Sequence, residues 1–175
     1  YIAGPSHAEE VAMGKLTGLI AASENPKNSI RFREVMKGPG LMVYSSLDVI
    51  GVQICAAAKN VMGIGAGMLD GLGYSVLKGA LMARGAHEVS NLIKAKGGNE
   101  LSAYGLCHLG DYEATLFSPH SHNRKFGEAF VKKEVFDGLA EGYYTAKAMM
   151  FLAKKYNVEL EVLSSLEVKP GTIVK

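Results

Sequence analysis

The stretch "ICAAAKNVMGIGAG", residues 54–67, decides the fold of this chain. Small and apolar residues fill it, and Lys59 is its one charged side chain. The pattern extends on both sides and predicts a long buried helix over 48–69, with Ser45 or Ser46 as its N-cap. A helix that is apolar on most of its surface must be covered by other elements. The stretch therefore predicts a mainly helical domain built around it.

Lys59 is the unusual residue of this helix. Its neighbours one helical turn away are Cys55, Ala56 and Gly63, whose short side chains leave room for a ligand. Two interpretations stay open at this point. Lys59 lies at the edge of a buried face, or it is a desolvated general base that works near neutral pH. Periodicity does not decide between them.

Composition excludes several classes of protein. The 175 residues suit one domain, and 48% hydrophobic with 21% charged residues excludes a disordered chain. A formal charge of +2 without a basic run gives no sign of a nucleic-acid or membrane-surface protein. No apolar run is expected to be long enough to cross a bilayer. Cys55 and Cys107 are too few for a disulfide framework, which fits a reducing cytoplasm.

Shorter elements are predicted on both sides of the central helix. Ser6 and Glu9 have the spacing of a capping box, so a helix is expected to start at His7, after a strand end at 1–3. A chain that opens on a strand end is expected to lack what precedes it. The remaining expected elements are a strand or buried connector at 17–23, a helix over 26–36, a strand at 41–46, a helix over 75–96, loops over 104–125, and helices over 126–138 and 143–156.

Two further motifs need an interpretation. "GIGAG", 63–67, does not complete a dinucleotide-binding loop and has no strand before it, so its glycines are expected to serve close helix packing. "SPHSHNRKFG", 118–127, offers hydroxyl, amide and guanidinium donors before a helix that is expected to start near Phe126. It is either an anion site, best suited to phosphate, or a capped helix with a solvated arginine. The spacing of the histidines does not favour a metal site.

Five motifs in order carry a resemblance over most of residues 1–156. They are "GPSHAEEVAMG", "DVIGVQICAAAKNVMGIGAGMLDGLG", "GLCHLGDYEAT", "SHNRKFG" and "AEGYYTAKA". This set resembles the bacterial NAD(P)-dependent glycerol-3-phosphate dehydrogenases. The resemblance implies a mainly α fold, the helical substrate domain of the 6-phosphogluconate-dehydrogenase C-terminal type, with a few short strands near the N-terminus. The family's Rossmann domain is expected to be absent, apart from its end at residues 1–10, with the helical domain over 11–175.

The resemblance also implies roles for single residues. Lys59 matches the family's proton acceptor, which takes the hydroxyl proton as hydride leaves for NAD or NADP. Asp111 matches a substrate contact that could also orient the lysine, and Lys59, Asp111 and Asn123 are expected to converge on one pocket. The other implied substrate contacts are Gly4, Ser6, Ser121 and His122; the implied cofactor contacts are Ala8, His122, Leu139 and Glu141; no metal is implied.

The chain departs from the family at three places. His122 replaces an arginine that serves substrate and cofactor phosphates, Gln53 replaces a glutamate, and 160–175 does not follow the family's C-terminal helices. The sequence leaves NAD versus NADP open, because the discriminating residues belong to the other domain. It also leaves a homodimer open.

Three functions remain as hypotheses. The first is the substrate-binding part of a cytoplasmic enzyme that interconverts sn-glycerol 3-phosphate and dihydroxyacetone phosphate for phospholipid synthesis. The second is a related dehydrogenase of another small phosphorylated or hydroxy acid. The third is a non-catalytic helical module for dimerisation or partner binding, against which the set of Lys59, Asp111 and Asn123 argues.

Overall fold

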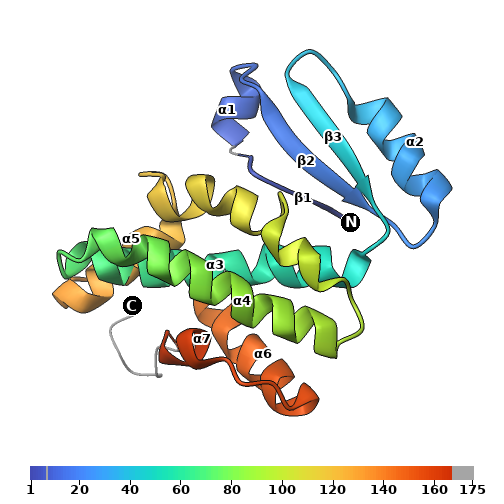
Figure 1. Cartoon of the computed structure of the whole chain (residues 1–175). Coiled ribbons are helices and arrows are strands. Elements are labelled where there is room, and N and C mark those ends of the chain that lie inside the picture. Colours follow the sequence, from blue (N-terminus) through green and yellow to red (C-terminus); the bar gives the residue numbers. More distant parts are fainter. Residues whose placement is uncertain (7, 167–175) are drawn as a thin grey trace.

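A three-stranded sheet forms from the first part of the chain. The computed structural model describes residues 1–6 and 8–166. In it, β1 (Ile2–Ala3) pairs antiparallel with β2 (Thr17–Ala22), and β3 (Leu41–Ser46) pairs parallel with β2 over its whole length. The helix α1 (Ala8–Ala12) lies between β1 and β2 in sequence, and α2 (Pro26–Met36) connects the two parallel strands (Figure 1).

The predicted strands and the first long helix are confirmed. The segment expected at 17–23 as a strand or buried connector contains the strand Thr17–Ala22, and 41–46 and 26–36 form the expected strand and helix. Pro26 occupies the first turn of α2, and the side chain of Asn25 accepts a hydrogen bond from the backbone N–H of Lys27 at 3.0 Å. The predicted helix start at His7 lies outside the described residues, and α1 is described from Ala8.

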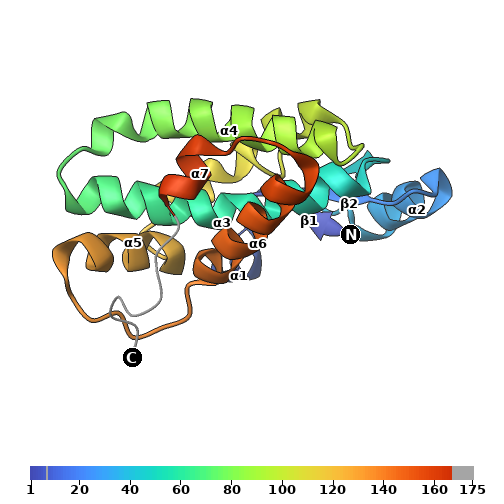
Figure 2. The same ribbon diagram turned by 90° about the horizontal axis from the view of Figure 1, so that it is seen from below.

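The helix α3 (Val49–Gly71) is the centre of the helical part. Around it pack α4 (Lys78–Ala95), α5 (His122–Lys132) and α6 (Glu141–Tyr156), while the short α7 (Glu161–Ser165) packs against α4 and α6 (Figure 2). The 3₁₀ turns are η1 (Ser75–Leu77), η2 (Glu100–Tyr104) and η3 (Leu109–Asp111), and η4 (Glu113–Phe117) is a turn of π-helix. The mainly helical fold with short strands near the N-terminus is therefore confirmed.

Glycines let α3 and α5 approach each other to backbone distance. A Cβ atom at Gly67 would lie 1.8 Å from the carbonyl oxygen of Arg124, and one at Gly127 would lie 2.0 Å from that of Ile64. No other residue fits at either position without separating the helices. The expected use of "GIGAG" in close helix packing is confirmed.

Predicted helix boundaries were wrong at the start of α3 and at both ends of α5. Asp48, rather than Ser45 or Ser46, caps α3, because its carboxylate accepts from the N–H of Gly51 at 2.9 Å while Ser46 accepts from the N–H of Asp48 itself. The helix expected over 126–138 is α5, which begins one turn earlier with Ser121 as its cap and ends at Lys132. The hydroxyl of Ser121 stabilises the polar first turn of α5, because it accepts a hydrogen bond from the backbone N–H of Arg124.

The expectation that no apolar run is long enough to cross a bilayer was also wrong. By length and composition, α3 qualifies as such a helix, at 23 residues. Most of its apolar stretch is buried inside the domain, however, against α4, α5 and α6. We conclude that α3 is the core helix of this fold.

Candidate active site

Lys59 and Asp111 form an ion pair and a hydrogen bond across the middle of the domain. Lys59 comes from α3, and Asp111 ends the 3₁₀ turn η3 (Leu109–Asp111). The Asp111 side chain is 1% exposed and that of Lys59 is 22% exposed. The carboxylate is therefore enclosed by protein, whereas the lysine side chain stays partly exposed. A lysine in this arrangement is held in one position while remaining accessible to a small molecule.

Asparagine side chains connect α3 to the N-termini of α5 and α6. The amide nitrogen of Asn123 donates to the side-chain oxygen of Asn60 at 3.2 Å, and the oxygen of Asn123 accepts from the backbone N–H of Gly142 at 2.9 Å. Asn60 donates in turn to the carboxylate of Glu141 at 3.3 Å. These bonds fix the starts of two helices beside Lys59.

A polar cleft of about 200 Å³ lies above the Lys59–Asp111 pair. The expected convergence of Lys59, Asp111 and Asn123 on one pocket is confirmed, since all three line it. The full lining consists of Ser6, Lys59, Asn60, Asp111, Ala114, Thr115, His120, Ser121, His122 and Asn123. A second cleft of about 490 Å³ shares Ser6, Ala114 and His120 with the first. The two clefts are therefore adjacent.

Thr115, Asn60 and His120 are cleft residues that the sequence analysis did not single out. Thr115 lies on the π-helical turn η4, and its methyl group and Asn123 both pack against Gly63, where a Cβ atom would meet them at 3.2 and 3.1 Å. Gly63, one helical turn from Lys59, thus makes room for Thr115 and Asn123, which line the cleft.

The remaining predicted residues lie outside this lining. Gly4 is buried with a φ of +143°, and its backbone packs against Gly18 of β2 so closely that a Cβ atom would lie 2.6 Å from the Gly18 carbonyl. Leu139 lines a separate apolar pocket with Phe126. Glu141 reaches the site through Asn60. Ala8 belongs to α1, but its side chain is outside the described part of the structure.

A buried histidine lies behind the ion pair. His108 is fully enclosed, with Nδ1 3.1 Å from the carbonyl oxygen of Cys55 and Nε2 2.7 Å from the hydroxyl of Tyr112. A carbonyl only accepts, so Nδ1 carries the proton and Nε2 accepts from Tyr112. Burial lowers the pKa of His108 to about 4, against the bond to Cys55 and assisted by the charge of Lys59. His108 is therefore a neutral support beneath the cleft.

Arg124 does not line the cleft, because its side chain bonds other groups of the protein. Its guanidinium Nη1 lies 2.8 Å from Asp70 Oδ2, and its Nε donates to the carbonyl of Ser118 at 3.2 Å. The sequence left open a solvated arginine at this position, but in the structure Arg124 is a partly buried ion-pair partner of Asp70. The cap expected from the same motif is present, since Ser121 caps α5 at the edge of the cleft. Among the described residues, no cluster of three or more His, Cys, Asp or Glu side chains suits a metal ion.

Comparisons with known proteins agree with this geometry. The family model described as "NAD-dependent glycerol-3-phosphate dehydrogenase C-terminus" matches residues 48–168. A "Glycerol-3-phosphate dehydrogenase [NAD(P)+]" of Treponema denticola is 39% identical over 100% of this chain and 57% of its own length. One of Thermus thermophilus is 40% identical over 94% of this chain and 53% of its own length. The chain thus spans about half the length of these curated relatives.

Solved structures show the same fold. The crystal structure of glycerol-3-phosphate dehydrogenase from Coxiella burnetii superposes with a TM-score of 0.88 at 33% identity, over 94% of this chain and 53% of that one. Fold and cleft therefore define the class, the C-terminal helical domain of a dehydrogenase. The chain belongs to the NAD-dependent glycerol-3-phosphate dehydrogenase family.

Proposed function

We propose that this chain is the substrate-binding part of an oxidoreductase that interconverts sn-glycerol 3-phosphate and dihydroxyacetone phosphate with NAD or NADP. The observation that carries the proposal is the Lys59–Asp111 pair at the wall of the cleft of about 200 Å³. The cleft suits a three-carbon phosphate in size and in its polar lining. The names of the relatives supply the reaction and the cofactor. We place the enzyme in the cytoplasm; a homodimer stays a prediction.

Lys59 is proposed as the proton donor and acceptor. In the direction of reduction, its ammonium group gives a proton to the C2 carbonyl oxygen; in oxidation, its neutral amine takes the proton of the C2 hydroxyl. Asp111 accepts a hydrogen bond from the amine and so holds Nζ in one position, which leaves the other substituent positions on Nζ for proton exchange with the substrate. Bound NAD or NADP supplies the hydride acceptor or donor.

The N-terminus of α5 is proposed to hold the phosphate. Ser121 and His122 lie at the first turn of this helix and line the cleft, and a helix N-terminus favours an anion. Asn123 uses its oxygen for Gly142 and one amide hydrogen for Asn60, and its second amide hydrogen can be donated to a phosphate oxygen.

The chain also has room for the cofactor beside the substrate. The second cleft, of about 490 Å³, adjoins the first along Ser6 and His120, so the two offer neighbouring places for a nicotinamide and a substrate. We propose that residues 1–10 end the dinucleotide-binding domain, with the helical domain over 11–175. Ala8, His122, Leu139 and Glu141 remain the proposed cofactor contacts; His122, Leu139 and Glu141 lie outside the second cleft, so they would contact parts of the cofactor other than the nicotinamide.

Substitution of Lys59 tests the proposal in the full-length protein. Lys59→Met should lower the rate of NAD(P)H-dependent reduction of dihydroxyacetone phosphate by about 10³-fold. It also leaves Asp111 buried without its cation, which should cost about 3 kcal/mol of stability. Lys59→Met combined with Asp111→Asn should recover stability but not activity.

The matched control is Lys94→Met, which removes an exposed lysine of α4 that pairs with Glu100. It should leave the turnover rate and the urea midpoint unchanged. Turnover in Lys59→Met within tenfold of the wild type would mean that Lys59 is a structural residue.

A further inference from the structure

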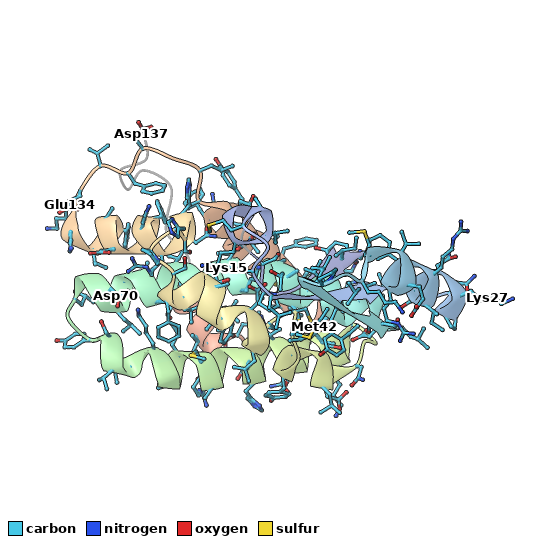
Figure 3. The ribbon with its side chains drawn as sticks, turned by 90° about the horizontal axis from the view of Figure 1, so that it is seen from above. Lys15, Lys27, Met42, Asp70, Glu134 and Asp137 are labelled. Atoms are coloured by element: carbon cyan, nitrogen blue, oxygen red, sulfur yellow. The ribbon has the colours of Figure 1, made fainter. Side chains whose placement is uncertain are left out.

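Asp70 lies near the end of α3 that is remote from the sheet (Figure 3), and it pairs with two cations, Lys78 and Arg124. Its Oδ2 lies 2.7 Å from Lys78 Nζ and 2.8 Å from Arg124 Nη1, and its Oδ1 accepts from the hydroxyl of Ser75 at 2.7 Å. These three charged side chains are 8–18% exposed. Burial alone would raise the pKa of Asp70, but the bonds from Lys78, Ser75 and Arg124 hold it below its ordinary value. Asp70 is therefore a carboxylate at neutral pH.

Besides Asp70, the two cations contact consecutive residues of one segment, Lys78 the first two and Arg124 the third. Lys78 Nζ donates to the carbonyl of Leu116 at 3.4 Å and lies 4.9 Å above the ring of Phe117. Arg124 Nε donates to the carbonyl of Ser118 at 3.2 Å. We call 116–118 the anchored segment. Each of its residues is contacted by one of two cations that both pair with Asp70, and Arg124 also pairs with Glu128 at 3.6 Å.

The anchored segment lies between two parts of the cleft wall. Thr115 precedes it directly, and His120 and Ser121 follow it, and all three line the cleft that holds Lys59. Phe117 and Ser118 themselves line the adjoining cleft. A shift of the anchored segment would therefore move cleft residues on both of its sides.

We propose that Lys78 and Arg124, through Asp70, are positioning residues that set the cleft wall from Thr115 to Ser121 for substrate binding. The inference deepens the proposed function and rests on it. Buried ion pairs add little net stability because their desolvation offsets their attraction, so stability alone does not account for this cluster. Directed bonds to the backbone carbonyls of Leu116 and Ser118 do fix the position of this part of the cleft wall, which is the surface that the substrate would contact.

Two variants of the full-length protein test the inference. Lys78→Met keeps an unbranched stem but removes the bond to Leu116, and Asp70 keeps Arg124 as its partner. Arg124→Lys keeps a cation beside Asp70 but loses the planar fork that also reaches Ser118. In each, hydrogen exchange of the amides in 113–121 should speed up by about tenfold. The KM for dihydroxyacetone phosphate should rise by about tenfold with kcat within about threefold, the signature of lost binding geometry. Lys78→Arg keeps a cation at this position, so its hydrogen exchange in 113–121 and its KM should both stay close to those of the wild type.

The matched control is Glu88→Gln, a buried carboxylate of α4 whose oxygens accept from the N–H groups of Val162 and Leu163 at the start of α7. It should lower stability and leave both the exchange of 113–121 and the KM unchanged. A wild-type KM, or wild-type exchange in 113–121, in both Lys78→Met and Arg124→Lys would overturn the inference. If the wild-type full-length protein does not reduce dihydroxyacetone phosphate, the proposed function is wrong. Hydrogen exchange in 113–121 would then be the measurement that tests whether Lys78 and Arg124 hold the anchored segment.

Discussion

His108 makes the stability of the domain sensitive to acid. Its pKa of about 4 in the fold lies below the ordinary value of 6.5. The unfolded chain therefore takes up a proton below pH 6.5, whereas the folded chain does so only near pH 4. The contribution of neutral His108 is complete above pH 6.5 and is lost as the pH falls toward 4, up to about 3 kcal/mol.

Urea unfolding at pH 7.5 and pH 5 measures this loss. His108→Gln should unfold with a weaker dependence on pH than the wild type, because an amide does not titrate. The exposed His87, substituted as His87→Gln, serves as the control and should keep the wild-type dependence. Equal pH dependence in His108→Gln and the wild type would contradict the assignment.

His122 is the residue at which a single substitution should improve the proposed enzyme. It begins α5 at the cleft, at a position where the sequence resemblance implies an arginine. A guanidinium is always charged and bonds phosphate with two N–H groups, whereas an imidazole is charged only in part near neutral pH. A bond to a charged group is worth about 1.5–3 kcal/mol, so His122→Arg should tighten binding of glycerol 3-phosphate by about 10- to 100-fold.

Isothermal titration of the full-length protein with glycerol 3-phosphate checks this prediction. The exposed His87→Arg adds the same charge away from the cleft and should have no effect. An unchanged dissociation constant in His122→Arg would mean that His122 does not face the phosphate.

Single residues of the site were predictable to different degrees. Lys59 and Asp111 lie in sequence motifs whose resemblance to the family implies a function for them, and in the structure they form an ion pair. Thr115 and Asn60 were missed because their position depends on a turn of π-helix and on a bond between two helices that have no local signal. Arg124 was misplaced for a similar reason, since its partner Asp70 is 54 residues away in sequence.

At the scale of elements, the contact between α3 and α5 is the least tolerant part of the fold. Gly67→Ala would place a methyl group 1.8 Å from the Arg124 carbonyl, so the helices must separate, at a cost of about 3 kcal/mol. Gly79→Ala adds the same methyl group to α4, where nothing lies within 4 Å, and should be neutral or stabilising by up to about 0.5 kcal/mol. Urea midpoints of the two variants give the comparison. Equal midpoints would show that α3 and α5 have room to adjust.

The elements follow local signals wherever these are strong. Pro26 and the turn after Met36 delimit α2, and the apolar runs of β2 and β3 are bounded by polar turns. The end of α5 could not be read in the same way, because Lys133 takes the left-handed conformation, with φ of 59°, that is usually left to glycine. Its start was missed because the first turn of α5 is polar and its first apolar residue, Phe126, is one turn further on.

At the scale of the whole molecule, this chain alone should not catalyse the reaction. It spans about half the length of its relatives, and hydride transfer needs nicotinamide and substrate held within about 3.5 Å of each other. The purified 175-residue chain should show no NAD(P)H-dependent reduction of dihydroxyacetone phosphate, while the full-length protein does. Turnover by the short chain would refute the prediction.

The pairing of Lys59 with Asp111 also has a kinetic consequence. The two residues are 52 positions apart, and Asn60 and Asn123, which bond each other beside them, are 63 apart. Contacts between such distant segments form late, because the entropy of closing a long loop is lost before the contact repays it. A growing or refolding chain therefore acquires its helices before it acquires its site. During that interval the chain is already helical but its cleft is not yet assembled.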